Sequence, residues 1–135
     1  MSEELRIIDV SIPQEVADLK LPAPELVDYY NDMHNRVIYI DYEIDNGLMR
    51  EVGRQIIEYN RVDKGKPREE REPIVILINS WGGDLNATYA TIAIMETSIT
   101  PVITVNMNSA YSAAGLLLMA GHKRYCMPRS QVLIH

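Results

Sequence analysis

IVILINSWGGDL, at residues 74–85, joins an apolar run to a pair of glycines. Its first five residues are all apolar, which predicts a strand buried on both faces, as strands of parallel sheets are. Gly82 and Gly83 end this strand, and a helix is expected directly after them because apolar residues then recur at helical spacing. The residues of that expected apolar face are Leu85, Tyr89, Ile92 and Met95. A buried strand followed by a helix indicates an α/β fold with a mainly parallel sheet.

Strands and helices are expected to alternate on both sides of this stretch. The expected helices cover residues 24–35, 46–60 and 113–120, and the expected strands cover residues 37–40, 102–105, 125–127 and 131–134. Nine charged residues between positions 61 and 73 predict a solvated loop. Residues 1–23 are acidic and contain two prolines, so we expect an N-terminal arm that precedes a single domain at residues 24–135.

Composition narrows the class of protein. The chain has 135 residues, 47% of them hydrophobic, which is enough for one domain with its own core. A net charge of −6 argues against a general affinity for nucleic acid or for anionic membranes. The longest apolar stretch, residues 113–120, is too short to span a bilayer, and we expect no secretory signal in the acidic N-terminus. With Cys126 as the single cysteine, these features predict the cytoplasm, with an organelle matrix or plastid left open.

The glycine pair has a structural and a functional interpretation. In the structural one, Gly82 and Gly83 form a tight turn that needs positive φ angles. In the functional one, only glycine lets a substrate backbone come close, and N–H groups at the start of a helix can hold an anion. A phosphate-binding loop is excluded because no Gly-Lys-Ser/Thr sequence follows.

Two further residues supply nucleophile and base chemistry. Ser112 lies between an expected strand and an expected helix, where a serine is commonly an N-cap. The same position also exposes its Oγ beside the N–H of Ala113, as in a nucleophile elbow. His135 ends the last apolar run; it is either a core or edge residue or, as a neutral imidazole, a general base. Backbone donors, a hydroxyl and an imidazole are the parts that nucleophilic acyl transfer needs.

The remaining histidines and the cysteine do not suggest a metal centre. His34 and His122 are scattered along the chain and form no metal-ligand spacing with Cys126, so we expect no metal site and no cofactor. In a predicted strand, Cys126 is expected to be a small buried hydrophobe.

Three segments in order carry a family resemblance. INSWGG at residues 78–83, AYSAAGLLLMAG at residues 110–121 and MPRSQVLIH at residues 127–135 resemble the proteolytic subunits of Clp proteases, ClpP, in a match that starts at about residue 37. The resemblance implies a ClpP/crotonase-like ββα superhelix and a serine-type endopeptidase. It implies that Ser112 is the nucleophile, that His135 is the general base, and that the N–H groups of Gly83 and Ala113 form the oxyanion hole. It also implies substrate binding by β-addition at Ser80, Trp81 and Gly82.

The same resemblance implies partners and marks departures. The expected substrate is a peptide or an unfolded protein, and the expected assembly is a homo-oligomeric ring fed by an AAA+ unfoldase. Trp81 stands where the family usually has proline, and Ala113 where it has methionine, which affects the shape of the substrate groove. The family's catalytic aspartate follows the histidine by many residues, so we expect the chain to be truncated at its C-terminus. A catalytically silent ring subunit and a crotonase-type acyl-CoA enzyme remain as alternatives.

Overall fold

The computed structural model describes residues 24–135 in two units. Helix α2, Pro24–Asn35, belongs to the first unit, which ends at Val37, and it confirms the helix expected at residues 24–35. The second unit runs from Ile38 to His135. The arm expected at residues 1–23 lies outside the described residues, so that boundary stays a prediction.

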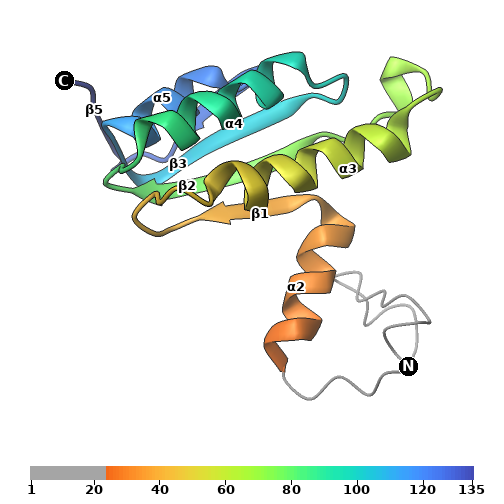
Figure 1. Cartoon of the computed structure of the whole chain (residues 1–135), viewed down its shortest axis with the longest axis horizontal. Coiled ribbons are helices and arrows are strands. Elements are labelled where there is room, and N and C mark those ends of the chain that lie inside the picture. The colour runs from red at the N-terminus through yellow and green to blue at the C-terminus, as the bar shows by residue number, and fades with distance from the viewer. Residues whose placement is uncertain (1–23) are drawn as a thin grey trace. The chain divides into compact units, whose positions relative to one another are not determined.

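Strands and helices alternate through the sheet-bearing part, as the sequence predicts (Figure 1). The elements in order are β1 Val37–Ile40, the π-helical turn η2 Met49–Gly53, α3 Arg54–Asp63, the 3₁₀ turn η3 Arg68–Glu70, β2 Ile74–Ser80, α4 Leu85–Thr97, β3 Val102–Tyr111, α5 Ala113–Ala120, β4 Lys123–Cys126 and β5 Gln131–Leu133. The helix expected at residues 46–60 is therefore η2 followed by α3, and it extends three residues further. The strand expected at residues 102–105 is more than twice as long, because β3 continues to the start of α5.

A five-stranded sheet forms the centre of this unit. The strand order is β1-β2-β3-β4, and β5 also pairs with β3. The pairs β2–β3, β3–β4 and β3–β5 are all parallel, which confirms the α/β class with a mainly parallel sheet. β4 pairs with the first half of β3 and β5 with its second half. Parallel strands align their carboxyl ends, so β2, β3 and β5 all end at the same side of the sheet.

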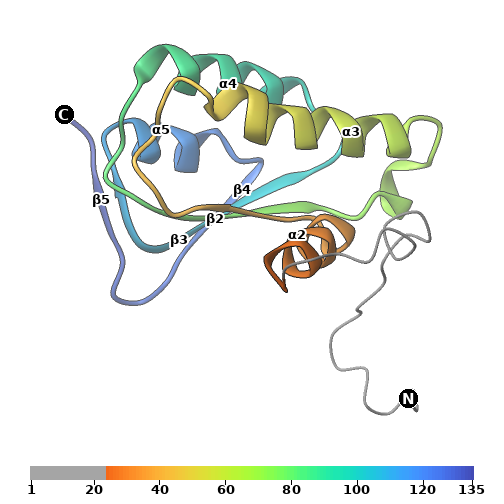
Figure 2. The same ribbon diagram turned by 60° about the horizontal axis from the view of Figure 1, so that its bottom comes forward.

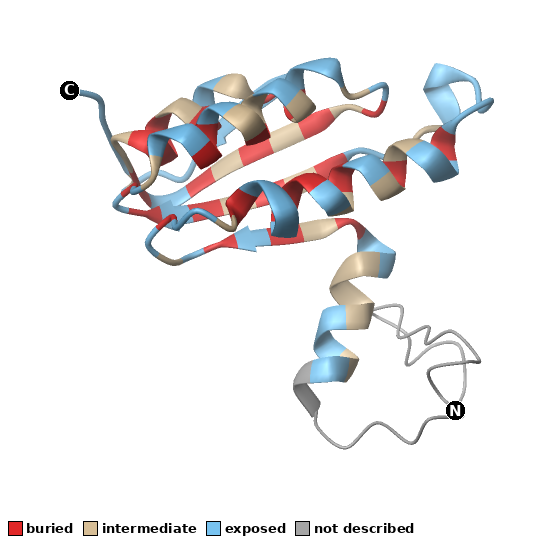
Figure 3. Ribbon diagram, in the orientation of Figure 1, coloured by how far each residue is buried: buried red, intermediate tan, exposed pale blue. Residues whose placement is uncertain are grey.

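All three helices α3, α4 and α5 lie on one face of the sheet (Figures 1 and 2), which corrects the expectation for the central strand. Strand β2 alternates between fully buried and less buried residues instead of being buried on both faces. Ile74, Ile76 and Ile78 point into the core, whereas Val75 and Leu77 are only half-buried. One-sided helix cover produces this alternation, and Figure 3 shows it along the strands.

Helix α4 uses the second half of the apolar face that the sequence suggested, because Met95 is buried and Ile92 packs against the core. The first half is wrong, since Leu85 and Tyr89 are 49% and 56% exposed. The other buried residues of α4 are Ala87, Thr88 and Thr91. Helix α4 also packs closely on η2, where a Cβ on Gly53 would lie 2.6 Å from Cδ1 of Ile94. The two buried threonines satisfy their hydroxyls on the helix's own carbonyl groups, Thr88 on Asp84 and Thr91 on Ala87.

The edge strands and the charged loop differ from expectation in detail. β4 begins two residues before the expected strand, and Cys126 is exposed rather than buried, because β4 lies at the end of the strand order.

The charged segment is mostly exposed, but α3 extends into it and buries Asp63 completely. The carboxylate of Asp63 accepts a 2.6 Å hydrogen bond from the hydroxyl of Thr100. A loop predicted to be solvated therefore contains a buried charge.

We expect Thr100→Val to destabilise the protein by about 1.5–3 kcal/mol, the typical value of a hydrogen bond to a buried charged group. Valine has nearly the shape of threonine, so little packing is lost. The matched control is Thr97→Val, whose exposed hydroxyl bonds only to helix carbonyls at 2.8 and 3.2 Å and whose loss should stay within about 0.5 kcal/mol. Urea unfolding of both variants measures the difference, and equal losses would show that Asp63 does not depend on Thr100.

Candidate active site

Ser112 occupies the single residue between β3 and α5. Its backbone has φ 55° and ψ −123°, a conformation that is costly for any residue with a side chain. Although Ser112 sits at the N-cap position, its side chain makes no capping hydrogen bond. Its hydroxyl has no hydrogen-bond partner within residues 24–135. The structure therefore places an uncommitted hydroxyl on a strained strand-to-helix turn, the backbone setting of a nucleophile elbow.

The Gly82 backbone lies directly against this turn. A Cβ on Gly82 would lie 2.7 Å from the Tyr111 carbonyl oxygen, 3.0 Å from Cβ of Ser112 and 3.1 Å from the backbone nitrogen of Ala113. Gly82 also has φ 107°, which residues with a side chain rarely adopt. Glycine is therefore required here on two grounds, and its small size lets the β2–α4 turn reach the β3–α5 turn.

Gly83 lies against a different segment, because its backbone packs on Ile44. The Ile44 N–H donates to the Gly82 carbonyl at 2.8 Å, and the Asp84 N–H donates to the Ile44 carbonyl at 2.9 Å. This makes a parallel bridge between Ile44 and Gly83, and a Cβ on Gly83 would overlap the Ile44 carbonyl. The sequence suggested that a glycine at this position leaves room for substrate. The structure shows instead that it makes room for the chain's own backbone.

Two backbone N–H groups near Ser112 are left without an acceptor. Backbone groups alternate in direction along an extended chain, and Gly82 C=O and Asp84 N–H both face Ile44. The N–H of Gly83 therefore faces away from Ile44. The N–H of Ala113 belongs to the first turn of α5, where helical donors have no partner within the helix. Neither N–H has a hydrogen-bond acceptor in the described part of the chain. Both N–H groups are suitable hydrogen-bond donors to an anion. The positive end of the α5 dipole further favours a negative charge at the N–H of Ala113.

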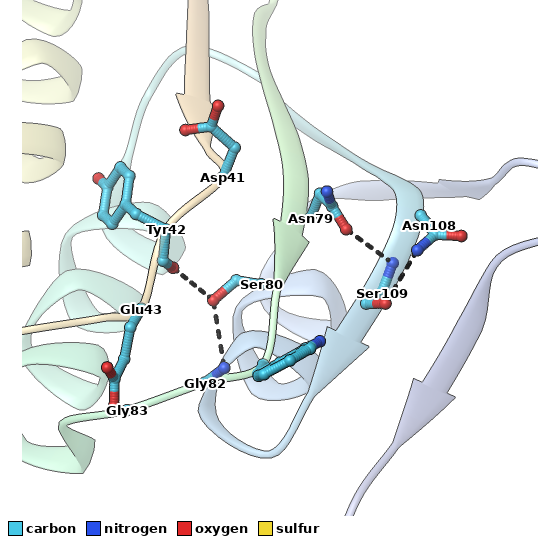
Figure 4. Close-up of a pocket in the computed structure, with 10 residues that line it drawn as sticks. Asp41, Tyr42, Glu43, Asn79, Ser80, Gly82, Gly83, Asn108 and Ser109 are labelled. Carbon is cyan, nitrogen blue, oxygen red and sulfur yellow. Dashed lines mark hydrogen bonds between the residues drawn. The ribbon is translucent and has the colours of Figure 1, made fainter.

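The hydroxyl of Ser80 is committed to the turn itself. It donates to the Tyr42 carbonyl at 2.7 Å and accepts from the Gly82 N–H at 3.1 Å, as Figure 4 shows. Since Ser80 is only 4% exposed, contact with a substrate through its hydroxyl would require breaking these bonds. Trp81 is the opposite case, because its side chain is 79% exposed. Asp84 caps α4 by accepting from the Ala87 N–H at 2.8 Å, which fixes the far end of the turn.

A cavity of about 530 Å³ lies beside this turn (Figure 4). Its lining comprises Asp41, Tyr42, Glu43, Asn79, Ser80, Trp81, Gly82, Gly83, Asn108 and Ser109. Burial raises the pKa of Tyr42 to about 12, with smaller contributions from the nearby carboxylates of Glu51, Asp41 and Asp45. The Tyr42 phenol therefore remains protonated at neutral pH and cannot act as a base there.

His135 lies two residues beyond β5, at the carboxyl end of the strand that pairs with β3 just before Ser112. The Ser112 N–H donates to the Leu133 carbonyl at 2.6 Å, which ties the serine to the same short segment. His135 is exposed, and no hydrogen bond joins it to Ser112 within the described residues. Catalytic hydrogen bonds are often long before substrate binds, so the roles of both residues stay predictions.

Several residues that shape the site gave no signal in the sequence. Ile44 acts through its main chain alone, so its side chain could not reveal it. A tyrosine–glutamine hydrogen bond of 2.8 Å joins Tyr111 to Gln131 beside Ser112. The N-cap Asp84 is the exception, because an aspartate directly before a helical pattern is a recognisable start signal.

The described residues contain neither a membrane-spanning helix nor a group of metal ligands. None of the helices between residues 24 and 135 is long and apolar enough to cross a membrane. Over the same residues, no three side chains of histidine, cysteine, aspartate or glutamate are grouped so that they could hold a metal ion.

The fold and this turn define an α/β domain with a serine on a strand-to-helix turn, faced by unpaired backbone N–H groups. Comparison with known proteins agrees with that class. The family model described as Clp protease matches residues 23–135. The chain belongs to the Clp protease family.

Several curated relatives show how distant the similarity is. The ATP-dependent Clp protease proteolytic subunit 2 of Tropheryma whipplei (strain Twist) is 32% identical over 105 residues, which cover 76% of this chain and 55% of the relative. The proteolytic subunit 1 of Bacillus cereus (strain ATCC 10987 / NRS 248) is 32% identical over 127 residues, covering 93% of this chain and 63% of the relative. The chain spans about half the length of the first curated relatives that it matches.

We expect Gly82→Ala to lower the free energy of unfolding by more than its positive φ alone would explain. The matched control is Gly65→Ala, where φ is +90° and no atom lies within 4 Å of the added Cβ. Gly65→Ala should cost about 1–2 kcal/mol. Gly82→Ala adds a main-chain clash and should cost about 2–5 kcal/mol in total. Urea unfolding measures both, and equal costs would show that the two turns do not pack as closely as described.

Proposed function

We propose that this chain is a serine endopeptidase subunit that hydrolyses peptide bonds in peptides and unfolded proteins. The observation that carries the proposal is the uncommitted Ser112 hydroxyl on a strained turn, with the unpaired N–H of Ala113 next to it. The second unpaired N–H, that of Gly83, belongs to the glycine turn that packs on Ser112. Membership of the Clp protease family and relatives called proteolytic subunits support the same conclusion.

In the proposed mechanism, Ser112 Oγ attacks the scissile carbonyl carbon and His135 takes its proton. The carbonyl oxygen becomes an anion, which the N–H groups of Gly83 and Ala113 stabilise. His135 then gives the proton to the leaving amine, and water hydrolyses the acyl-serine in a second cycle. Removal of one oxyanion donor typically lowers kcat by about 10²–10³-fold. No cofactor takes part in these steps.

The proposed substrate lies along the glycine turn as an added β-strand. Ile44 pairs with only one side of the segment around Gly83, and the other side offers the main-chain groups of Gly83 to a peptide. Recognition through main-chain hydrogen bonds requires an extended substrate and reads little of its sequence. Unfolded proteins meet that requirement, and the exposed indole of Trp81 adds an apolar surface beside it.

The proposed assembly is a homo-oligomeric ring in the cytoplasm. The relatives named above are described as subunits of an ATP-dependent protease, and this description motivates the proposal that an AAA+ unfoldase delivers substrates to this chain as well. Enclosure in a ring would restrict access to Ser112, which otherwise lies on a solvent-accessible turn.

A catalytically silent ring subunit is the second candidate function. The observation that favours it is that no hydrogen bond or ion pair joins a carboxylate to His135 within residues 24–135. In serine proteases with a Ser-His-Asp triad, a misdirected histidine tautomer lowers kcat by about 10⁴-fold. The two candidates therefore differ in whether Ser112 is reactive.

A fluorophosphonate probe separates the two candidates. We expect the probe to label the chain on Ser112, and Ser112→Ala to abolish both labelling and peptide hydrolysis. The control is Ser98→Ala, since Ser98 follows the carboxyl end of α4, where its hydroxyl donates to the Thr100 carbonyl at 2.7 Å. Mass spectrometry of the labelled peptide identifies the residue. A folded chain that is not labelled would favour the silent subunit, and a label on another serine would refute the mechanism.

A further inference from the structure

The strand that precedes His135 is weakly attached to the rest of the domain. β5 has three residues, all of them exposed, and among the described strands it pairs with β3 alone. The pairs are Ser109 with Gln131, Ala110 with Val132 and Tyr111 with Leu133. A three-residue strand paired on one side has little stability of its own, and such segments open locally at low free-energy cost. Contacts outside the ladder therefore determine how well this strand stays in place.

One such contact anchors the start of β5 to the core. The Asn106 side chain is completely buried in β3, and its Nδ2 donates to the Gln131 carbonyl at 2.9 Å. The Asn106 carbonyl accepts from the Met127 N–H at 3.0 Å, so this one residue holds both ends of the turn between β4 and β5. One bond from its buried side-chain amide and one to its backbone carbonyl therefore fix where β5 begins.

A second contact joins side chains on the two strands. The hydroxyl of Tyr111 donates to Oε1 of Gln131 at 2.8 Å. Because Tyr111 pairs with Leu133, Gln131 is its diagonal neighbour two residues earlier, within the reach of a tyrosine side chain. Tyr111 directly precedes Ser112, and Gln131 lies four residues before His135.

We propose that Tyr111 and Gln131 are positioning residues, which hold β5 in register and thereby keep His135 beside Ser112. The proposal rests on the proposed function, in which these two residues are base and nucleophile. Neither Tyr111 nor Gln131 contacts the reacting atoms. Their hydrogen bond restrains the strand on the histidine side relative to the strand on the serine side, and acyl transfer is sensitive to displacements of about 1 Å between such groups.

The test uses variants of the full chain that remove only this hydrogen bond. Tyr111→Phe removes the donor and Gln131→Leu removes the acceptor, whereas Gln131→Glu retains an acceptor oxygen and should rescue. The matched control is Tyr125→Phe on β4, a tyrosine that is 54% exposed and whose hydroxyl has no hydrogen-bond partner in the described residues. Two quantities are measured: the rate of fluorophosphonate labelling of Ser112 and the amide hydrogen exchange of residues 127–135.

We expect Tyr111→Phe and Gln131→Leu each to slow labelling by roughly two- to tenfold, which corresponds to one ordinary hydrogen bond. Both should speed exchange in β5 and leave the urea midpoint nearly unchanged. The double variant should be no slower than either single one, because both remove the same interaction. Gln131→Glu and Tyr125→Phe should behave as wild type.

Two results would overturn the proposal. Wild-type exchange in Tyr111→Phe would show that the pair does not hold β5. Faster exchange with unchanged labelling would show that it holds β5 without positioning His135. If Ser112 in the wild-type chain is not labelled, the proposed function fails, and the exchange comparison then decides by itself whether the pair holds the strand.

Discussion

The main-chain bridge between Ile44 and the glycine turn is the interaction on which the rest of the site depends. Two hydrogen bonds, to Gly82 C=O and from Asp84 N–H, fix which way the backbone between them faces. They direct the N–H of Gly83 away from Ile44. The same turn packs its other glycine, Gly82, against Ser112 and Ala113. A buried strand, a loop from another part of the chain and a helix start thus converge on a few backbone atoms, and the side chains of Ser80 and Asp84 secure the same turn.

The elements of the fold were predictable from the sequence, but the buried faces of β2 and of the first half of α4 were not. An all-apolar run such as residues 74–78 identifies a strand, yet periodicity alone does not tell whether one or both faces are covered. That depends on where α3, α4 and α5 pack. In α4 the apolar period pointed to Leu85 and Tyr89, whereas close packing selected smaller residues, Ala87 and Thr91. The burial of Asp63 could not be predicted from the sequence either, because its hydrogen-bond partner Thr100 is 37 residues away in the chain.

For the site, the sequence identified the residues at the two turns but not what constrains them. Gly82, Gly83 and Ser112 each have a common structural use, and they were recognisable because they occur in order within segments that resemble the Clp protease family. The clash that requires glycine at position 83 comes from the main chain of Ile44, and any residue at position 44 could provide it. The two sides of the site also differ in how firmly they are held. The glycine side is built into the sheet, whereas the histidine side depends on a three-residue strand and a few side-chain hydrogen bonds.

A crystal structure of the protein after reaction with a fluorophosphonate would show whether the N–H groups of Gly83 and Ala113 form an oxyanion hole. We expect a phosphorus atom bonded to Ser112 Oγ, with the phosphoryl oxygen about 2.7–3.1 Å from the backbone nitrogens of both Gly83 and Ala113. The bridge from Ile44 to Gly82 and Asp84 should be unchanged. A phosphoryl oxygen turned toward solvent with both N–H groups unpaired, or a Gly83 N–H rotated toward Ile44, would contradict this expectation.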